Sequence, residues 1–269
     1  MPDDPEFGTL LGYSPYLNVV QLRANLLGYA GRWPEAASAF ERMIAVAREH
    51  GHQALMGYAS TDYGWWAAIF GDLPIALAQC RRGVEVAEKL GSQMMRVYAY
   101  NALGVAELST GRPSEAVAAL EKALRIAREM RTGEEAALQT LAHLAEAYLA
   151  EGDAARAREL VENAVSEACR YRVLAAECFA RLVHARVLLS TDGPTSGAGA
   201  ASALERALAL VEETGARCWA AFIRVERARL ARLSGDEAGY EQEMRLAQRL
   251  FTEMGATARA EEVARKVER

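Results

Sequence analysis

The stretch STGRPSEAVAALEKAL, residues 109–124, decides the fold because versions of it recur along the chain at 31–43, 71–83 and 152–164. Each version begins at or just before a glycine, and Gly31, Gly71, Gly111 and Gly152 follow one another at intervals of about 40 residues. Self-similarity at a fixed period of this length is typical of proteins that stack one supersecondary unit many times. The sequence therefore predicts a repeat architecture.

Glycine and proline mark the ends of helices inside each unit. Glycine just past an amphipathic run is the expected left-handed end of a helix, and Pro34, Pro74 and Pro113 follow within three residues, where proline can begin the next helix. Each unit is thus helix, short turn, helix. We expect an N-terminal extension at 1–15, helix pairs at 16–50, 53–91, 93–131, 134–171, 174–215 and 218–255, and a capping helix at 257–269.

The apolar positions of a unit repeat at helical spacing. In the third unit Leu103 and Gly104 share a face of the first helix, and Ala116, Leu120 and Ala123 share a face of the second. Small residues alternating with large ones at spacings of three and four let two helices approach closely. We expect the segment TDGPTSGAGA, residues 191–200, to interrupt the fifth unit as a flexible loop.

Composition favours an all-α protein and excludes several classes. Helix-forming Ala, Leu, Glu and Arg dominate, while the 269 residues include only 7 prolines. A formal charge of −5 gives no field that attracts nucleic acid or an anionic membrane. The acidic start MPDDPEFG lacks the pattern of a secretory signal, and the four cysteines show no disulfide or metal spacing. We expect a cytoplasmic protein that contacts neither membrane nor nucleic acid, with buried, reduced thiols.

The repeat resembles the tetratricopeptide repeat. The resemblance depends on Leu103 and Gly104, on the trio Ala116, Leu120 and Ala123, and on the Gly-Arg-Pro turn, and it covers nearly the whole chain. At about 40 residues the unit is longer than the usual one and is similar to repeats of bacterial MalT-like regulators and of proteins that join a class III adenylate cyclase domain to an ATPase. The resemblance implies a superhelical solenoid, right-handed in the family, and a regulatory region of a larger bacterial signalling protein.

A search for catalytic motifs finds none. Phosphate-binding loops and nucleophile elbows are missing from the sequence. His143 and Glu146 lie three apart on one helical face, a spacing that a metal site can use, but two ligands do not make a site. The arginines between Arg217 and Arg232 form a basic stripe that Glu237, Glu241 and Glu243 can neutralise. We therefore expect no enzyme, no cofactor and no metal.

In stacked helix pairs the first helices line a concave inner wall, where a partner binds. Projecting the repeat pattern onto the sequence places amide and aromatic side chains there, which suit a peptide backbone and offer large contact areas. The alternative is that Tyr58, Tyr63, Trp65 and Trp66 only fill the seam between pairs one and three. Because four aromatic residues within nine positions cannot all face inward, we expect two of them in the core and Trp65 or Tyr58 exposed. The predicted partner-binding residues are Asn18, Gln21, Asn25, Tyr29, Tyr58, Thr61, Trp65, Tyr98, Asn101, Gln139 and Glu146.

These observations favour a non-catalytic module that binds a protein or peptide. One alternative is a regulator in which a peptide or small ligand makes the superhelix more compact. Another is a metal enzyme centred on His143 and Glu146. Homodimers are also considered, because residues 13–17 would form an exposed apolar end.

Overall fold

The computed structural model describes residues 15–267, and within that range it contains helices and no strand. The predicted all-α repeat solenoid is confirmed: twelve α-helices form six successive pairs, and a thirteenth covers the last pair. The pairs are α1 (Pro15–Tyr29) with α2 (Trp33–Glu49), α3 (Gln53–Phe70) with α4 (Leu73–Leu90), α5 (Gln93–Ser109) with α6 (Pro113–Met130), α7 (Glu134–Glu151) with α8 (Ala154–Tyr171), α9 (Leu174–Thr191) with α10 (Gly197–Thr214), and α11 (Ala220–Leu233) with α12 (Glu237–Glu253), followed by α13 (Thr257–Val267). The predicted extension at 1–15 and the last two residues of the predicted cap lie almost entirely outside the described residues.

The helices end where the chain adopts a left-handed backbone conformation. Gly71, after α3, has φ +90°, a value that costs glycine nothing because it has no Cβ. Two second helices end the same way without glycine, at Arg131 with φ 49° and at Arg172 with φ 56°. Glycine punctuation therefore reports most helix ends, and two arginines adopt the same conformation at a cost of roughly 1 kcal/mol each.

Within a pair, small residues set how closely the helices approach. Gly64 of α3 faces α4, and a Cβ built on it would lie 2.5 Å from Cys80 Sγ and 2.7 Å from the Cys80 backbone nitrogen. Gly104 of α5 faces Leu120 of α6 in the equivalent place, where a Cβ would lie 2.4 Å from Leu120 Cγ. The glycines are thus needed for the backbone separation inside the pairs.

We predict that Gly64→Ala destabilises the protein by about 1 to 3 kcal/mol, because the added methyl group forces the α3 and α4 backbones apart. Gly199→Ala is the matched control: it lies in α10, where the nearest atom to an added Cβ is Leu188 Cδ1 at 3.5 Å. This change should stabilise the helix by roughly 0.5 to 1 kcal/mol. Urea unfolding followed by circular dichroism measures both, and equal effects of the two substitutions would contradict the packing argument.

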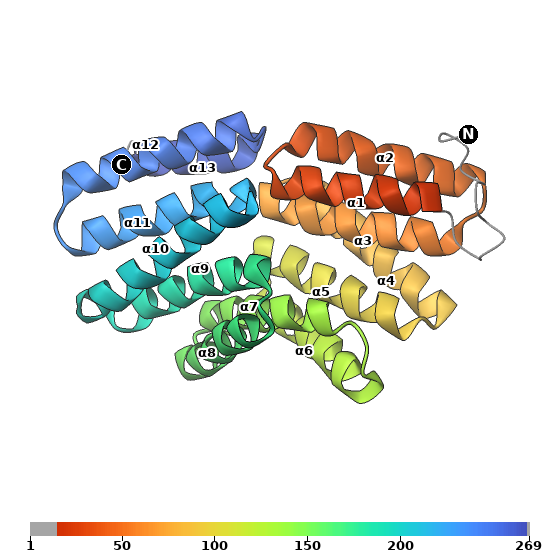
Figure 1. Cartoon of the computed structure of the whole chain (residues 1–269), viewed down its shortest axis with the longest axis horizontal. Helices are drawn as coiled ribbons and strands as arrows, with labels where there is room; N and C mark the ends of the chain where they lie inside the picture. Colours follow the sequence, from red (N-terminus) through yellow and green to blue (C-terminus); the bar gives the residue numbers. More distant parts are fainter. Residues whose placement is uncertain (1–14, 268–269) are drawn as a thin grey trace.

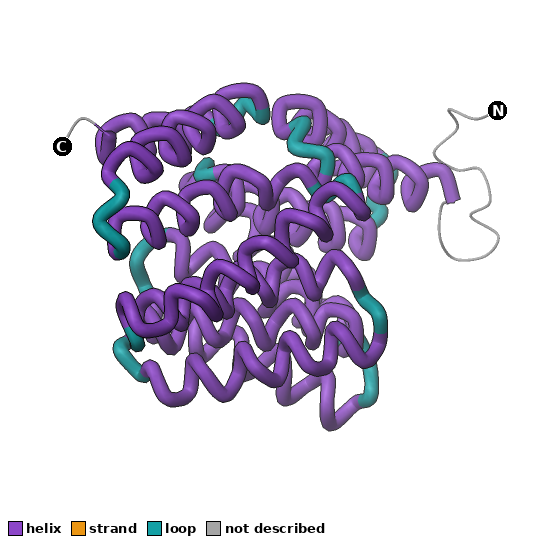
Figure 2. The backbone as a smooth tube through the Cα atoms, turned by 60° about the vertical axis from the view of Figure 1, so that its left-hand side comes forward, coloured by secondary structure: helices purple, strands orange, loops and turns teal. Residues whose placement is uncertain are grey.

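The solenoid curves until its two ends meet. Figure 1 shows α12 and α13 beside the end of the α1–α2 pair, and Figure 2 shows the same helices together from a second direction. The Trp33 backbone N–H donates to the Met254 carbonyl at 3.3 Å. Arg259 of α13 donates to the carbonyl oxygens of Ala68 at 3.1 Å and Ile69 at 3.2 Å, near the end of α3. The described residues thus form one closed turn of a superhelix.

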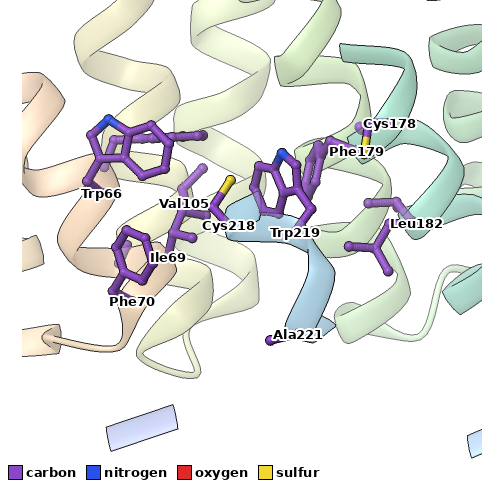
Figure 3. Packing of buried hydrophobic residues seen from close by; sticks show 14 of the residues in the cluster. Trp66, Ile69, Phe70, Val105, Cys178, Phe179, Leu182, Cys218, Trp219 and Ala221 are labelled. Atoms are coloured by element: carbon purple, nitrogen blue, oxygen red, sulfur yellow. The ribbon is translucent and has the colours of Figure 1, made fainter. Parts of the chain in front are cut away.

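Aromatic side chains fill the middle of this turn. Trp66 of α3 and Trp219, which precedes α11, approach it from opposite sides, with Cys218 and Val105 between them (Figure 3). Trp65 packs edge-on against Trp66, with ring centroids 4.6 Å apart, and Phe179 lies 4.7 Å from Trp219. Trp65, Trp66, Phe179 and Trp219 thus form an aromatic plug. This plug divides the inner space into separate cavities, so the space is not an open channel.

Two expectations about local structure are wrong. Only Asp192 separates α9 from a 3-10 turn at Gly193–Ser196, and residues 197–200 of the expected loop already belong to α10. The physical reason is burial, because Ala200 packs into the core and stabilises the first turn of α10 despite its glycines. Cysteine burial also differs: Cys80, Cys178 and Cys218 are buried, whereas Cys169 is exposed.

In the described part of the chain, none of the helices has both the length and the apolar character needed to span a membrane.

Candidate binding cavity

One cavity, of about 500 Å³, opens on the inner wall between α1, α3, α5 and α7. Every predicted partner-binding residue except Glu146 lines this cavity. The fold thus brings together residues of four first helices that the repeat pattern had placed on the inner wall. These residues are Asn18, Gln21, Asn25, Tyr29, Tyr58, Thr61, Trp65, Tyr98, Asn101 and Gln139. The structure shows that they share one cavity, and their role in binding a partner stays a prediction.

A chain of hydrogen bonds orders the side chains between α1 and α3. The Trp66 indole Nε1 donates to Asn25 Oδ1 at 2.7 Å, and Asn25 Nδ2 in turn donates to Asp62 Oδ2 at 2.8 Å. Gln21 Nε2 donates to the same Asp62 oxygen at 2.8 Å. Because the indole can only donate, Asn25 must present its carbonyl oxygen to Trp66 and its amide N–H to Asp62. The network therefore has a defined polarity.

Further contacts tie the cavity wall to α7. Gln139 donates to the Tyr29 hydroxyl at 3.3 Å, which links α7 with α1. The Thr140 hydroxyl donates to Asn101 Oδ1 at 3.0 Å, and both side chains are buried. Burial raises the pKa of Tyr29 to about 12, so the phenol is neutral and available as a donor throughout the physiological range. The wall is consequently held by bonds between pairs one, three and four.

The expectation that Trp65 or Tyr58 is exposed is wrong for Trp65. Trp65 is 9% exposed, packs edge-on against Trp66 and lines the cavity with the little surface that it exposes. Tyr58 is half-buried and lines the wall. The Thr61 side chain is buried, and a Cβ on Gly83 of α4 would lie 2.3 Å from its hydroxyl oxygen, so the hydroxyl faces α4. Trp65 and Thr61 are both more buried than expected because other helices cover α3 on nearly every side.

Sequence reasoning missed Asp62, the residue at the centre of the network. It is the only charged residue in α3, a helix that is otherwise apolar, small or uncharged. Tyr58, Asp62 and Trp65 also follow the four-plus-three spacing that places side chains on one helical face. A solitary carboxylate on the aromatic face of a buried helix was therefore a readable signal.

Asp62 is a carboxylate with a raised pKa in a cavity wall that contains no cation among the described residues. Burial raises its pKa above the ordinary 3.8, and the hydrogen bonds from Asn25 and Gln21 only partly oppose that effect. Its charge in turn contributes to the raised pKa values of Tyr29, Tyr58, Tyr98 and the Cys80 thiol, which lie on the helices around it. None of the described residues that line the cavity is Lys, Arg or His.

We predict that Asp62→Asn stabilises the protein at pH 7. The pKa of Asp62 is higher in the native state than in the unfolded chain, so the native state binds more protons and stability falls as pH rises from about 3.8 through the raised value. Removing the charge removes that loss, while the amide oxygen still accepts hydrogen bonds. Urea unfolding of both proteins at pH 4 and pH 7 measures the effect, and a variant that is less stable at pH 7 would contradict it.

Glu146 lies at the other side of the aromatic plug, in a smaller cavity of about 280 Å³. It lines this second cavity because it belongs to the C-terminal half of α7, and its role in binding a partner stays a prediction. Arg186 of α9 bonds to Glu146 and, through Nε, to Glu226 Oε1 of α11 at 2.8 Å. Burial alone would raise the pKa of Glu146, but the Arg186 charge and the nearby His143 imidazole hold it below its ordinary value.

The same contacts bear on the metal hypothesis. His143 Nδ1 lies 3.5 Å from Glu146 Oε2, but the guanidinium of Arg186 occupies the carboxylate that a metal would need.

The basic stripe is partly neutralised within the molecule, as the sequence indicated. Arg224 and Arg227 both pair with Glu243, at 3.1 and 2.9 Å, while Glu241 pairs with Arg245 on its own helix.

Comparisons with known proteins agree with this architecture. Residues 96–130, which span α5 and α6, match the family model described as tetratricopeptide repeat, and residues 10–70 match that of anaphase-promoting complex subunit 5. The comparison with curated proteins gave no match.

Solved structures extend the similarity over most of the chain. The crystal structure of nearly identical TPR-like repeats of a kinesin light chain from Podosopora anserina is 20% identical, with a TM-score of 0.51, and the match covers 74% of this chain and 96% of that one. A variant of the same repeats gives a TM-score of 0.52 at 20% identity, covering 74% and 95%. At this identity the similarity shows the fold. The chain is an all-α repeat solenoid, one unit of which, residues 96–130, matches the tetratricopeptide-repeat model.

Proposed function

We propose that this protein is a non-catalytic binding module that holds a segment of a protein or peptide in the cavity between α1, α3, α5 and α7. Tetratricopeptide repeats generally serve as scaffolds for protein interactions. The observation that carries the proposal is the convergence of amide and aromatic side chains from four first helices on one cavity. Asn and Gln pair with backbone donors and acceptors, and half-buried tyrosines offer rigid contact area with a polar end.

Substituting Tyr98 tests the proposed site. Tyr98 lines the cavity, is half-buried and has no side-chain hydrogen bond to the described residues, so Tyr98→Ala should leave the fold intact. We expect it to weaken partner capture about fivefold or more, as removal of an aromatic anchor does. Tyr171→Ala, on the exposed surface of α8, is the matched control and should bind normally.

The measurement has two stages. Proteins captured from a lysate of the source organism by the immobilised chain are identified by mass spectrometry, and the bound segment is then titrated by calorimetry against the wild type and both variants. Loss of affinity in Tyr171→Ala but not in Tyr98→Ala would move the site to the outer surface and contradict the proposal.

We further propose that the module is the regulatory region of a larger bacterial signalling protein and works in the cytoplasm. The support is the length of the repeat and its resemblance to the repeats of MalT-like and cyclase-linked regulators. Homodimer formation through the apolar end at residues 13–17 stays a prediction, because the side chains of that segment lie outside the described residues.

The alternative, in which a ligand makes the superhelix more compact, has less support from the geometry. The first and last pairs already meet through Trp33 with Met254 and through Arg259 with the end of α3, so little room is left for further closure. Small-angle scattering with and without a bound peptide separates the two functions, since only the regulator becomes more compact.

A further inference from the structure

The binding cavity carries negative charge without a matching cation. Asp62 lies in its wall, Glu135 of α7 stands exposed at its edge, and the described lining residues include no Lys, Arg or His. The two hydrogen bonds that Asp62 receives from described residues come from neutral amides, and both reach the same oxygen, Oδ2. A partly buried carboxylate is normally paired with a cation or a metal, so this one differs from the ion pairs elsewhere in the protein.

Other partly buried carboxylates of the first helices show the contrast. Glu146 and Glu226 share Arg186, and Glu177 of α9 is contacted by Arg181 and Arg206. Each of these carboxylates thus has an arginine from a neighbouring helix or its own. Asp62 has none among the described residues, although it lies in the same layer of first helices.

We propose that the cavity recognises an alkylammonium group of a peptide, with Asp62 as its counter-ion. This inference rests on the proposed function and specifies the chemistry of the bound segment. The group is a primary ammonium, carried either by a lysine side chain or by a free N-terminus. Either source brings three N–H donors and a positive charge to a wall that supplies a carboxylate and no competing cation.

The hydrogen-bond chain keeps the carboxylate in place for such a ligand. Trp66 fixes the orientation of Asn25, and Asn25 and Gln21 together hold Oδ2 from the α1 side. Oδ1 receives neither of these bonds and is the oxygen that a third donor would use. Support from two neutral amides orients the carboxylate without cancelling its charge.

Aromatic rings supply the rest of the recognition. Tyr29, Tyr58, Trp65 and Tyr98 line the same cavity as Asp62, and the Asp62 charge acts on the three phenols. A cation near the face of a tyrosine or tryptophan ring is attracted by the ring quadrupole, while the methylene groups of an alkylammonium chain pack against apolar ring surface. A volume of about 500 Å³ accommodates one long side chain or a terminal residue.

The test uses four synthetic pools of random hexapeptides with amidated C-termini, incubated with the immobilised full chain. The pools combine a free or an acetylated N-terminus with the presence or absence of lysine, and arginine is omitted from all of them. Retained peptides are quantified by mass spectrometry. We expect the pool that has neither amine to be retained least, and the two mixed pools show whether the lysine or the N-terminus is the source.

Two variants connect retention with Asp62. Asp62→Asn keeps the size of the side chain and should reduce retention of the amine-containing pools about 30-fold or more, as loss of one partner of a buried charge pair does. Glu241→Gln removes one negative charge from the exposed side of α12 and should retain the peptides like the wild type. Thermal unfolding confirms that both variants are folded.

The outcomes are distinguishable. Equal retention of the amine-free pool and the other three, or unchanged retention by Asp62→Asn, would overturn the ammonium proposal and leave peptide binding in the cavity standing. Failure of the folded wild type to retain any pool would overturn both. Preferential retention of one amine source, abolished in Asp62→Asn and preserved in Glu241→Gln, is the expected result.

Discussion

Arg186→Met should destabilise the protein by about 3 to 5 kcal/mol at pH 7, because it leaves two partly buried carboxylates without a cation. The guanidinium lies between Glu146 of α7 and Glu226 of α11, and its side chain is 22% exposed against 16% and 9% for the two glutamates. Methionine fills most of the same volume, so the loss reflects charge rather than a cavity.

The pH dependence gives this prediction a second readout. In the wild type the pKa of Glu146 is held below its ordinary 4.5, so its contribution to stability is present above that value and is lost as pH falls through the lowered pKa. Without Arg186, burial raises the pKa of Glu146. Protonation of Glu146 then removes the unpaired charge and lessens the destabilisation of the variant. The difference in stability between wild type and Arg186→Met should therefore shrink as the pH falls, first through the raised pKa of the variant above 4.5 and then from 4.5 through the lowered pKa of the wild type.

Two controls make the result specific. Arg245→Met removes the same type of side chain from an exposed ion pair with Glu241 on α12 and should change stability little. The triple variant Glu146→Gln, Arg186→Met, Glu226→Gln removes all three charges and should recover most of the lost stability. Equal destabilisation by the single and the triple variant at pH 7 would show that packing, not charge, accounts for the loss.

Trp66→Ala should destabilise the protein by about 3 to 5 kcal/mol, the range for removal of a large buried aromatic side chain. Trp66 is 1% exposed, and its ring centroid lies 4.9 Å from that of Tyr29 and 5.8 Å from that of Phe70. The substitution also removes the donor to Asn25, so the amide that orients Asp62 is released. Chemical unfolding, with calorimetry as an independent check, measures the loss.

A double-mutant cycle with Gly28 tests the packing explanation. A Cβ on Gly28 of α1 would lie 2.4 Å from Trp66 Cε2, so Gly28→Ala alone should be destabilising. Once the indole is gone, the same methyl group enters vacated space. The double variant should therefore be more stable than the sum of the single effects requires, and strict additivity would contradict direct packing of Gly28 on the indole.

Trp66→Phe separates the hydrogen bond from the packing. Phenylalanine keeps most of the buried ring but cannot donate to Asn25, so it should cost less stability than alanine. It should still loosen the arrangement of Asn25 around Asp62. If Trp66→Phe binds peptides as well as the wild type does, the orienting role of the indole is wrong.

The repeat pattern predicted much of the candidate site as well as the fold. Positions such as Asn25, Tyr58 and Tyr98 follow from counting along first helices, because residues at equivalent places in stacked pairs face the same inner surface. Glu146 lines a different cavity from the other ten predicted residues, because the pattern gives the face of a helix but not the height along it at which the inner space is blocked. Asp62 was missed although its isolation in α3 was visible in the sequence.

The sequence by itself determined the helix pairs, most of their turns and the inner face of most first helices, since these depend on local spacing, on glycine and on proline. Only the tertiary structure decided that the turn closes, with Trp33 against Met254 and Arg259 against the end of α3. It also decided that Trp65, Trp66 and Trp219 block the middle and leave Asp62 in one cavity. The physical reason is that closure sums small rotations between six packed pairs, and no local pattern records contacts between residues about 200 positions apart.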